Sequence, residues 1–416
     1  MNYFAYPSNL SVFHGFYRLH ELYVSTVLRG FKYRMYPTLE QEVLLRKTIG
    51  CARLVYNRAL ADRSNAWIAG KKSIGYAQQS KALTTWKKDP ELIFLNEVSS
   101  VPLQQALRHL QDAYSNFFLH RSKYPRFKSK RSGGSVTFTR NVFCLRAGKL
   151  TLAKMAEPLN VRWSRSLPDG AVPSSVSISL DSAQRWHVSI MCEDNTVKPL
   201  PKIKTAIGID LGITSIVTLS TGEKIPNPKH DGRELARRKL LAHRLSRKKK
   251  GSKNQYKARI KLARCYAKIT DRRKDYLHKL STRLVHENQV IVVEDLNVSG
   301  MVKNHKLARV ISDAGWRMLL TFLEYKCSWY GRELIKVDRF YPSSKTCSAC
   351  GHIVEHLPLE VRSWVCPACK AEHDRDENAA HNILAAGLAV SACGPDVSHG
   401  VLRNAVQSGM NQEARL

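Results

Sequence analysis

Apolar residues in the first half of the chain follow a strand pattern, then a helical pattern, then a strand pattern again. Residues 29–37 alternate as a β-strand does and stop at a proline, after which apolar residues recur at helical spacing over residues 38–120. Glycines and prolines interrupt that stretch, so several helices are predicted rather than one. Short β-rich runs fill residues 136–192 and predict a small antiparallel barrel or sheet, which the strand at 29–37 joins.

The pattern changes after a linker of proline and lysine residues at 198–204, where a new domain is predicted to start. Its predicted elements, in chain order, are an apolar β-hairpin at 206–222, a pair of basic helices at 229–283, a buried strand at 290–296, an amphipathic helix at 312–330 and another strand at 333–338. Residues 1–28 and 393–416 lack such periodic apolar positions. We expect the first segment to be a flexible extension and the second to be a disordered tail.

Composition makes nucleic acid the expected partner of this chain. Its 416 residues, 43% of them apolar, are enough for two or three domains. Subtracting 34 Asp and Glu from 67 Lys and Arg leaves a formal net charge of +33, which strains a compact fold unless a polyanion neutralises it. The sequence contains neither a run of about 18 apolar residues nor a secretory signal pattern, so a cytoplasmic, nucleoid-associated protein without membrane contact is expected.

Two basic segments are the candidate contacts with nucleic acid. Residues 124–135 interleave aromatic and basic side chains before a glycine turn, which suits phosphates and stacked bases but equally suits long side chains lying over a core. Residues 229–283 hold 21 Lys and Arg against four Asp and Glu; a solvated pair of helices is the alternative, but a face of one sign repels itself and favours phosphate contacts. The candidate contact residues are Arg126, Lys128, Lys130, Arg131, Arg247, Lys248, Lys249 and Lys250.

Three acidic residues stand in apolar surroundings, where an isolated charge is costly to bury. Asp210 lies within AIGIDLGI, Glu294 ends the aliphatic run VIVVE, and Asp376 stands where a helix begins in HDRDENAAHNIL. Magnesium or manganese ions prefer carboxylate oxygens, and a pair of such ions about 3.5–4 Å apart can generate the nucleophile and stabilise the leaving oxygen in phosphodiester hydrolysis. The three acids therefore predict one shared cation site.

Each acid also has an explanation that needs no metal. Asp376 could cap the helix that follows it, Asp210 could be a turn residue of the hairpin, and Glu294 could form a salt bridge at the end of its strand. Asp374 could be the ligand in place of Asp376, and Asp295 raises a similar alternative beside Glu294. One shared site explains all three positions at once, so it is the stronger hypothesis.

Four of the ten cysteines form the most specific local motif in the chain. Two C-x-x-C pairs separated by 15 residues match the spacing of zinc sites. The four residues are Cys347, Cys350, Cys366 and Cys369. Four thiolates leave no coordination position open for water, so a structural Zn²⁺ in a zinc ribbon is predicted rather than a redox pair. His373 and His352 nearby are either further ligands, DNA contacts or, as the favoured alternative, surface residues. The other cysteines are expected to be ordinary core or tail residues.

Several motifs together resemble the TnpB family, the insertion-sequence-encoded relatives of type V CRISPR effectors. GIDLGITSIVTLSTG, VVEDLNVSGM, the cysteine pattern and HDRDENAAHNIL, in this order, are similar to the RuvC-like nuclease core of that family. FKYRMYPTLEQE, ARLVYNRAL, YPRFKSKR, SRKKKGS and ISDAGW extend the resemblance over about residues 29–390. The resemblance implies an α/β RNase H-like (RuvC) core with an inserted zinc ribbon, and catalytic acids at Asp210, Glu294 and Asp376 that use Mg²⁺ or Mn²⁺.

The function implied by the resemblance is that of an RNA-guided DNA endonuclease encoded by an insertion sequence. Such a protein binds a guide RNA made from the transposon end, recognises a short motif beside its double-stranded DNA target, and is expected to be monomeric in the ribonucleoprotein. The residue types at Tyr76, Ser80, Gln104 and Thr139 match those that family members place where the motif is read. The alternatives are a nuclease-inactive RNA-guided DNA-binding repressor, a strand-transferring transposase and, less favoured, a Holliday-junction resolvase.

The domain arrangement is predicted from the patterns and the resemblance together. The predicted domains are the extension at 1–28, a β-barrel wedge domain at 29–37 and 124–200, a helical recognition domain at 38–123, a RuvC-like nuclease domain at 201–342 and 373–392, the zinc ribbon at 343–372 and the tail at 393–416. The zinc ribbon thus interrupts the nuclease core directly before Asp376, where its folding can position that acid.

Overall fold

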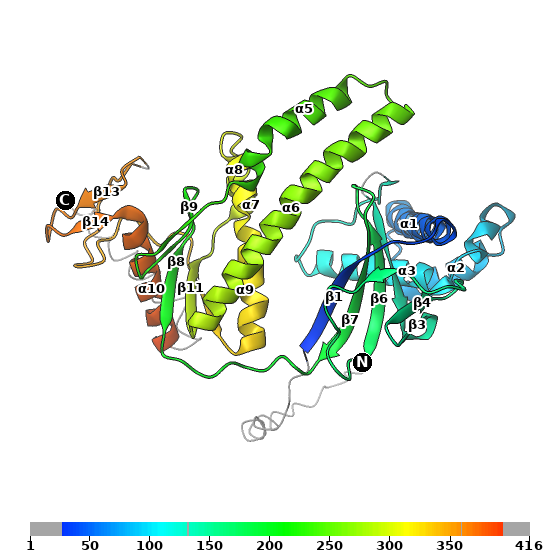
Figure 1. Cartoon of the computed structure of the whole chain (residues 1–416), viewed down its shortest axis with the longest axis horizontal. Helices are drawn as coiled ribbons and strands as arrows, with labels where there is room; N and C mark the ends of the chain where they lie inside the picture. The colour runs from blue at the N-terminus through cyan, green and yellow to red at the C-terminus, as the bar shows by residue number, and fades with distance from the viewer. Residues whose placement is uncertain (1–26, 131–132, 359, 394–416) are drawn as a thin grey trace, which may run out of the picture. The chain divides into compact units, whose positions relative to one another are not determined.

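The computed structural model describes residues 27–130, 133–358 and 360–393, which fall into two compact units divided between Val197 and Lys198 (Figure 1). This division coincides with the start of the predicted linker. The expected flexible extension and disordered tail lie, apart from residues at their inner ends, outside the described residues.

The first unit contains a five-stranded antiparallel sheet, in which the strands lie in the order β2-β6-β7-β1-β5. Its strands are β1 (Val27–Met35), β2 (Gly134–Thr139), β5 (Val161–Arg162), β6 (Pro173–Leu180) and β7 (Trp186–Asp194), and β3 (Phe143–Arg146) with β4 (Lys149–Leu152) forms a separate hairpin. The first strand joins the sheet as predicted, but it begins before residue 29, because Val27 and Leu28 already pair with β7. The predicted boundary of the extension at residue 28 is therefore wrong by two residues. The pairing among the described residues gives a sheet and a hairpin, so closure into a barrel is not confirmed.

Several helices, rather than one, connect β1 to β2, as predicted. They are α1 (Leu39–Gly70), α2 (Tyr76–Trp86) and α3 (Ser100–Phe118), with the short 3-10 segment η1 (Pro90–Asn96) between α2 and α3. A second 3-10 segment, η3 (Arg140–Val142), follows β2. A capping box starts α1, because the Thr38 hydroxyl accepts a hydrogen bond from the Gln41 amide while the Gln41 side chain accepts one from the Thr38 amide. This reciprocal pairing fixes the helix start directly after Pro37.

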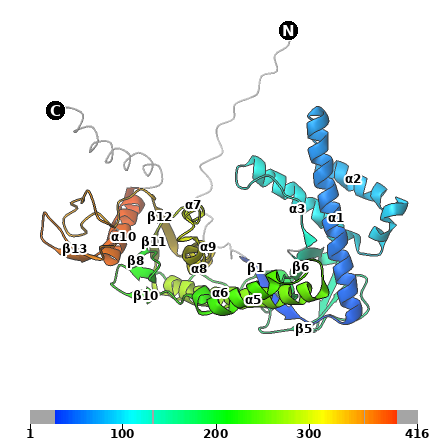
Figure 2. The ribbon, with the colours of Figure 1, turned by 90° about the horizontal axis from the view of Figure 1, so that it is seen from above.

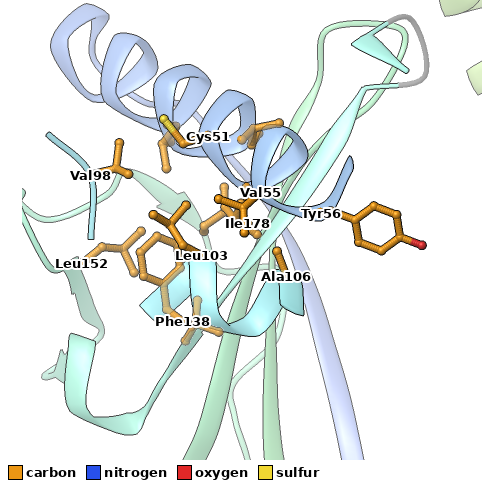
Figure 3. Packing of buried hydrophobic residues seen from close by; sticks show 14 of the residues in the cluster. Cys51, Val55, Tyr56, Val98, Leu103, Ala106, Phe138, Leu152 and Ile178 are labelled. Atoms are coloured by element: carbon orange, nitrogen blue, oxygen red, sulfur yellow. The ribbon is translucent and has the colours of Figure 1, made fainter. Parts of the chain in front are cut away.

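Apolar side chains of α1 and α3 pack onto β2 and β6 to form the core of the first unit. Figure 3 shows Val55 and Leu103 from the helices meeting Phe138 and Ile178 from the strands. Helix α1 lies close to the sheet, since a Cβ atom added to Gly134 on β2 would lie 2.4 Å from Cγ2 of Ile49 on α1. The helical and β segments of this unit therefore share one core.

The second unit is built on a mixed sheet in the order β10-β9-β8-β11-β12. Its strands are β8 (Ala206–Asp210), β9 (Ser215–Leu219), β10 (Lys224–Pro226), β11 (Val290–Glu294) and β12 (Glu333–Val337), and a small hairpin is formed by β13 (Ser363–Val365) and β14 (Glu372–Asp374). The pairs β8–β11 and β11–β12 are parallel, whereas β8–β9 and β9–β10 are antiparallel. A mixed sheet flanked by helices agrees with the prediction for this half.

The helices of the second unit are α4 (His230–Arg233), α5 (Leu235–Ser246), α6 (Lys253–Glu287), α7 (Val298–Met301), α8 (Ala308–Ala314), α9 (Trp316–Tyr330) and α10 (Arg375–Cys393). The single amphipathic helix predicted at 312–330 is wrong, because Gly315 adopts a left-handed conformation with φ of 74° and separates α8 from α9. A side chain there would also crowd Arg273 and Leu277 on α6. The apolar pattern continued across this break and concealed it.

The two faces of the second sheet carry different helices. One face packs against α6 and α9, and the side chains in this cluster include Ile207, Ile209, Ile291, Val293, Leu277 and Leu319. The other face packs against α10, with Val292 and Ile383 in a smaller cluster. Residues that alternate along β8 and β11 therefore point to different helices.

Candidate functional site

Two of the predicted acids lie on the face of the sheet that α10 covers. Helix α10 packs so closely on this face that neither Gly208 of β8 nor Gly387 of α10 leaves room for a side chain. A Cβ atom added to Gly208 would lie 2.1 Å from a carbonyl oxygen of α10, and one added to Gly387 would lie 2.3 Å from Cγ1 of Val292 on β11. Side chains two residues further along a strand point to the same face. Asp210 at the end of β8 and Glu294 at the end of β11 therefore face α10, and the parallel pairing of these strands brings their ends together.

The third acid completes a group of three carboxyl groups. Asp376 lies in the first turn of α10. Burial raises the pKa of Asp210 to about 7, and the negative charges of Glu294 and Asp376 add to the rise. Burial also raises the pKa of Glu294. The structure thus brings Asp210 close enough to the other two predicted acids for their charges to act on it, although the three come from separate motifs.

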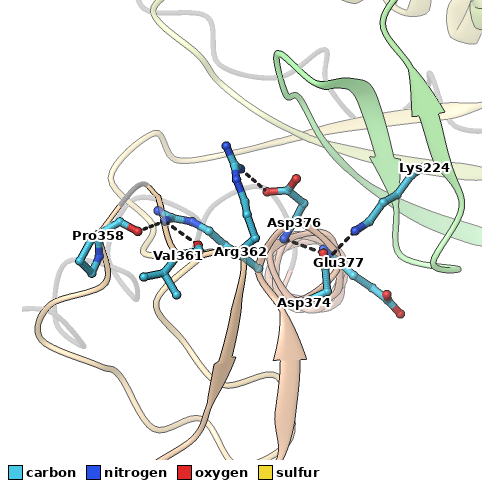
Figure 4. A network of polar contacts seen from close by, with 8 residues as sticks. Lys224, Pro358, Val361, Arg362, Asp374, Asp376 and Glu377 are labelled. Carbon is cyan, nitrogen blue, oxygen red and sulfur yellow. Dashed lines mark hydrogen bonds and ion pairs between the residues drawn. The ribbon is translucent and has the colours of Figure 1, made fainter.

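Asp374 and Asp376 have different partners, although they are two residues apart. Oδ1 of Asp374 accepts hydrogen bonds from the amides of Asp376 and Glu377, both at 3.1 Å, and thereby caps α10 (Figure 4). Its other oxygen pairs with Nζ of Lys224 at 2.6 Å. Burial alone would raise the pKa of Asp374, but the Lys224 ammonium and the two amides lower it below the usual value. The cap that was considered for Asp376 is thus provided by Asp374.

Asp376 approaches a cation from the cysteine-rich insert. Oδ1 of Asp376 lies 3.3 Å from Nη1 of Arg362, which precedes β13 (Figure 4). The Arg362 side chain is 62% exposed and the Asp376 side chain 23% exposed, so water and salt screen this pair. Asp376 therefore keeps a partly open side chain whose only charge partner among the described ion pairs is an exposed arginine.

A short segment before the first cysteine pair connects this site to α10. Ser343 is buried and its hydroxyl donates a hydrogen bond to Oε1 of Glu294. The Asn382 side-chain amide donates to the carbonyl oxygens of Ser343 at 2.8 Å and Thr346 at 2.6 Å, and the Asn378 amide donates to Thr346 at 2.7 Å. These residues carry no signal in the sequence, because serine and asparagine in a loop and on a helix do not reveal a partner 30 to 50 positions away.

The four cysteines come together as their spacing predicted. Their sulfur atoms lie within 4.8 Å of one another. Sγ of Cys347 is 3.6 Å from Sγ of Cys369, and Sγ of Cys350 is 3.7 Å from Sγ of Cys366. His373 is not a surface residue without partners, since its Nε2 lies 3.0 Å from Sγ of Cys347. Within the described part of the chain, this is the one group of three or more potential ligands drawn together so closely.

Helices α5 and α6 form a basic hairpin, in which they lie side by side in both views (Figures 1 and 2). Acidic partners occur at its base, where Arg238 pairs with Asp231 at 3.1 Å and Arg273 pairs with Asp313 at 2.8 Å. Residues 235–270 contain fourteen Lys and Arg but neither Asp nor Glu. The predicted contacts Arg247, Lys248, Lys249 and Lys250 are exposed in the turn at its tip. The hairpin is therefore neutralised at its base and strongly cationic toward its tip.

A cavity of about 410 Å³ opens in the first unit where α1 and α3 meet β2. Basic residues Arg53, His109 and Lys128 line it, and its lining among the described residues includes no acid. Asn57 holds the Lys128 backbone from both sides, donating to its carbonyl oxygen at 3.0 Å and accepting from its amide at 2.8 Å. The Lys128 ammonium lies 3.9 Å from the centre of the Tyr56 ring. The segment predicted to contact phosphate thus forms part of a basic concave surface.

The other predicted contacts of the first unit are distributed over its elements. Tyr76 starts α2, where the Arg108 guanidinium lies 5.2 Å from its ring centre; Ser80 is also on α2. Gln104 on α3 is exposed, and Thr139 ends β2, which packs against α3. Exposed positions are also found for Arg126 and Lys130, whereas Arg131 is not among the described residues. These placements leave the motif-reading assignment a prediction.

None of the described helices is both long enough and apolar enough to cross a membrane.

Three family models match successive parts of the chain. A model described as "Probable transposase" matches residues 189–305, one described as "Cas12f1-like, TNB domain" matches residues 316–383, and one described as "Helix-turn-helix domain" matches residues 25–72. Within that last range the described residues form β1 and the single continuous helix α1, not two helices joined by a turn.

Relatives and solved structures match nearly the whole chain. A Streptomyces pristinaespiralis protein named "Putative RNA-guided DNA endonuclease" is 61% identical over 372 residues, covering 89% of this chain and 92% of the relative. An Escherichia coli K12 protein, "Putative RNA-guided DNA endonuclease InsQ", is 34% identical over 392 residues, which cover 90% of this chain and 96% of the relative. The Cas12f1 protein in a complex with sgRNA and target DNA has a similar fold, with a TM-score of 0.52 at 15% identity over 86% of this chain and 98% of that one. The chain belongs to the TnpB family of RNA-guided DNA endonucleases.

Proposed function

We propose that this protein is an RNA-guided DNA endonuclease that cuts DNA by metal-dependent hydrolysis at Asp210, Glu294 and Asp376. The observation that carries the proposal is the convergence of three carboxyl groups from two strand ends and a helix start, in a chain with a net charge of +33. A group of three neighbouring acids that is largely shielded from water is unfavourable without cations, because each charge raises the cost of ionising the next. Bound divalent cations would offset that cost, and they could then act on the phosphodiester bonds of a polyanionic substrate.

The acidic residues would have different roles in such a site. Asp210 and Glu294, fixed on adjacent parallel strands, offer carboxylate oxygens from a rigid sheet, and Asp376 offers its own from the start of α10. Bound Mg²⁺ or Mn²⁺ would supply the activated nucleophile and stabilise the leaving oxygen. Asp374 is held by Lys224 and by its helix cap, so it is occupied in structural contacts. This difference supports Asp376 over Asp374 as the third ligand.

The four cysteines are proposed to hold a structural Zn²⁺. Sulfur atoms bound at about 2.3 Å to a tetrahedral ion lie about 3.8 Å apart, and the observed separations of 3.6 and 3.7 Å fit that geometry. A disulfide would bring two sulfur atoms to about 2.0 Å, which neither pair approaches. The donor set therefore fits zinc and leaves no position for a substrate.

The partners are proposed to be a guide RNA made from the transposon end and a double-stranded DNA target beside a short motif. The basic hairpin tip of the second unit and the basic cavity of the first unit give each unit a cationic surface, as a protein needs when it retains one polyanion and meets another. Tyr76, Ser80, Gln104 and Thr139 are proposed to read the motif, by resemblance alone. Base pairing with the RNA would then supply most of the sequence selectivity.

The experiment is to replace the guide. RNA that copurifies with the protein is sequenced, its guide segment is exchanged, and plasmids carrying either the old or the new target beside a randomised motif are offered in Mg²⁺. We expect cutting to follow the new guide and to stop when the RNA is removed. Cutting that ignores the guide would contradict the proposal.

A second candidate function is that of a transposase, which the description of the family model over residues 189–305 favours. Strand joining in an assay with donor ends would identify it.

A further inference from the structure

Residues 343–348 form a strap that links the cysteine insert, the sheet and α10. It begins at Ser343, whose hydroxyl contacts Glu294, and it contains Cys347, the first cysteine. Asn378 and Asn382 bind it from the side of α10, and the Ser348 amide donates back to Oδ1 of Asn378 at 2.9 Å. One short run of chain therefore touches the elements that carry Glu294 and Asp376 and provides a ligand of the four-cysteine site.

The strap is held firmly where it meets Glu294. Ser343, Asn378 and Asn382 are 7%, 2% and 5% exposed, so their hydrogen bonds are shielded from water. A broken bond in such a place leaves a buried polar atom without a partner, which is costly. The Ser343 hydroxyl has one donor hydrogen, and giving it to Glu294 fixes which way that carboxyl group turns.

This contact involves one of the two Glu294 carboxylate oxygens, Oε1. A donor that approaches one carboxylate oxygen also leaves the other oxygen free to face the site. Partners of this kind, behind a metal ligand, orient it and tune its affinity.

We propose that Ser343 is a positioning residue for Glu294 in metal binding, and that Asn378 and Asn382 hold the strap so that the folded cysteine insert sets the geometry of the nuclease site. The inference rests on the proposed function only in taking Glu294 as a ligand of the catalytic ions. It explains why the insert enters the chain directly after β12, beside the ends of the strands that carry the acids.

The test compares Ser343→Ala with Ser343→Thr, which keeps the hydroxyl, and with Ser344→Ala, a neighbouring serine not bonded to Glu294. Mn²⁺ binding to each purified protein is measured by electron paramagnetic resonance, together with zinc content, DNA affinity of the ribonucleoprotein and the Mg²⁺ dependence of cleavage. We expect S343A to bind Mn²⁺ about 10–100-fold more weakly, with zinc content and DNA affinity kept, and S343T to restore much of the binding. The S344A protein should resemble the wild type.

Three results would overturn the proposal. These are unchanged Mn²⁺ binding in S343A, an equal loss in S344A, and a loss that comes with departure of zinc, since the last would make Ser343 a folding residue. Failure of the proposed function is seen separately, because the wild-type ribonucleoprotein would then not cut its guided target. Mn²⁺ binding needs no guide, so it reports on Ser343 in either case.

Discussion

The four cysteines and the three acids of the second unit are the two proposed metal sites of the chain, but they are assembled in opposite ways. The cysteines come from one insert of about 30 residues, and their sulfur atoms already lie within 4.8 Å of one another. The acids come from two strands and a helix spread over 167 positions, and they are not drawn together so closely. A closed set of soft ligands suits a structural ion, whereas a group of hard, mutually repelling ligands suits ions that exchange and act on a substrate.

The two sites also differ in how they depend on their surroundings. The cysteine cluster makes its own turns, with backbone hydrogen bonds from the Gly351 amide to Cys347 at 2.9 Å and from the Lys370 amide to Cys366 at 3.0 Å. The acids depend on close packing of α10 against β8, where Gly208 leaves room. Removal of an ion should therefore unfold the first site locally but only loosen the second.

The largest effect is expected from Cys347→Ser. The loss of one thiolate should release the metal ion and unfold the insert, because structural zinc supplies much of the folding free energy of such a small element. The strap to Glu294 should then be lost, and cleavage should fall to background. Metal analysis and a cleavage assay measure this, with Cys144→Ser, an exposed cysteine outside the cluster, as the matched control. Zinc-free protein that still cuts would contradict the prediction.

The next effect separates the neighbouring acids. Asp376→Asn should abolish cleavage, because it removes a charged ligand. Asp374→Asn should reduce cleavage only a few-fold, since asparagine caps a helix about as well as aspartate and only the Lys224 pair is lost. Cleavage rates of both variants, at equal DNA occupancy, give the measurement. The reverse order of the two variants would assign the third ligand to Asp374.

A moderate effect is expected on stability without divalent ions. Because the pKa of Asp210 in the fold is raised to about 7 from 3.8, its ionisation destabilises the metal-free protein progressively as pH rises between these values. Asp210→Asn should therefore raise the melting temperature in chelator by a few degrees at pH 8, and by less at pH 5. Scanning calorimetry at both pH values tests this. A variant that is no more stable than the wild type at pH 8 would show that the acids do not strain the apo fold.

The smallest effect is expected at Asp295. Its carboxylate lies beside Glu294 in sequence, but it pairs with Arg339 at 3.1 Å and both side chains are more than 40% exposed. Exposed pairs of this kind contribute about 0–1 kcal/mol. Asp295→Asn should thus leave cleavage within about two-fold and the melting temperature nearly unchanged. A large loss of cleavage would mean that Asp295 belongs to the acidic group.

The sequence indicated more of the cysteine cluster than of the acidic site, and the difference has a physical reason. The cysteine spacing is local, so it specified the cluster almost completely. The acids were predicted because Asp210 and Glu294 stand next to apolar residues in the sequence, but the face they share follows from the strand register and from α10, which only the fold supplies. Ser343, Asn378 and Asn382 were missed since their partners are distant in sequence. The break at Gly315 was missed because the apolar periodicity of α8 and α9 runs across it.

In the proposed function, Asp210, Glu294 and Asp376 perform guided cutting while other parts of the protein bind the nucleic acids. The most direct test of this division measures guided DNA binding and cleavage in the same samples for Asp210→Ala, Glu294→Gln and Asp376→Asn, each loaded with the same RNA. We predict that every variant binds the guided target within a few-fold of the wild type and that none cuts it in Mg²⁺. Guided cutting at a normal rate by any of the three would contradict the claim.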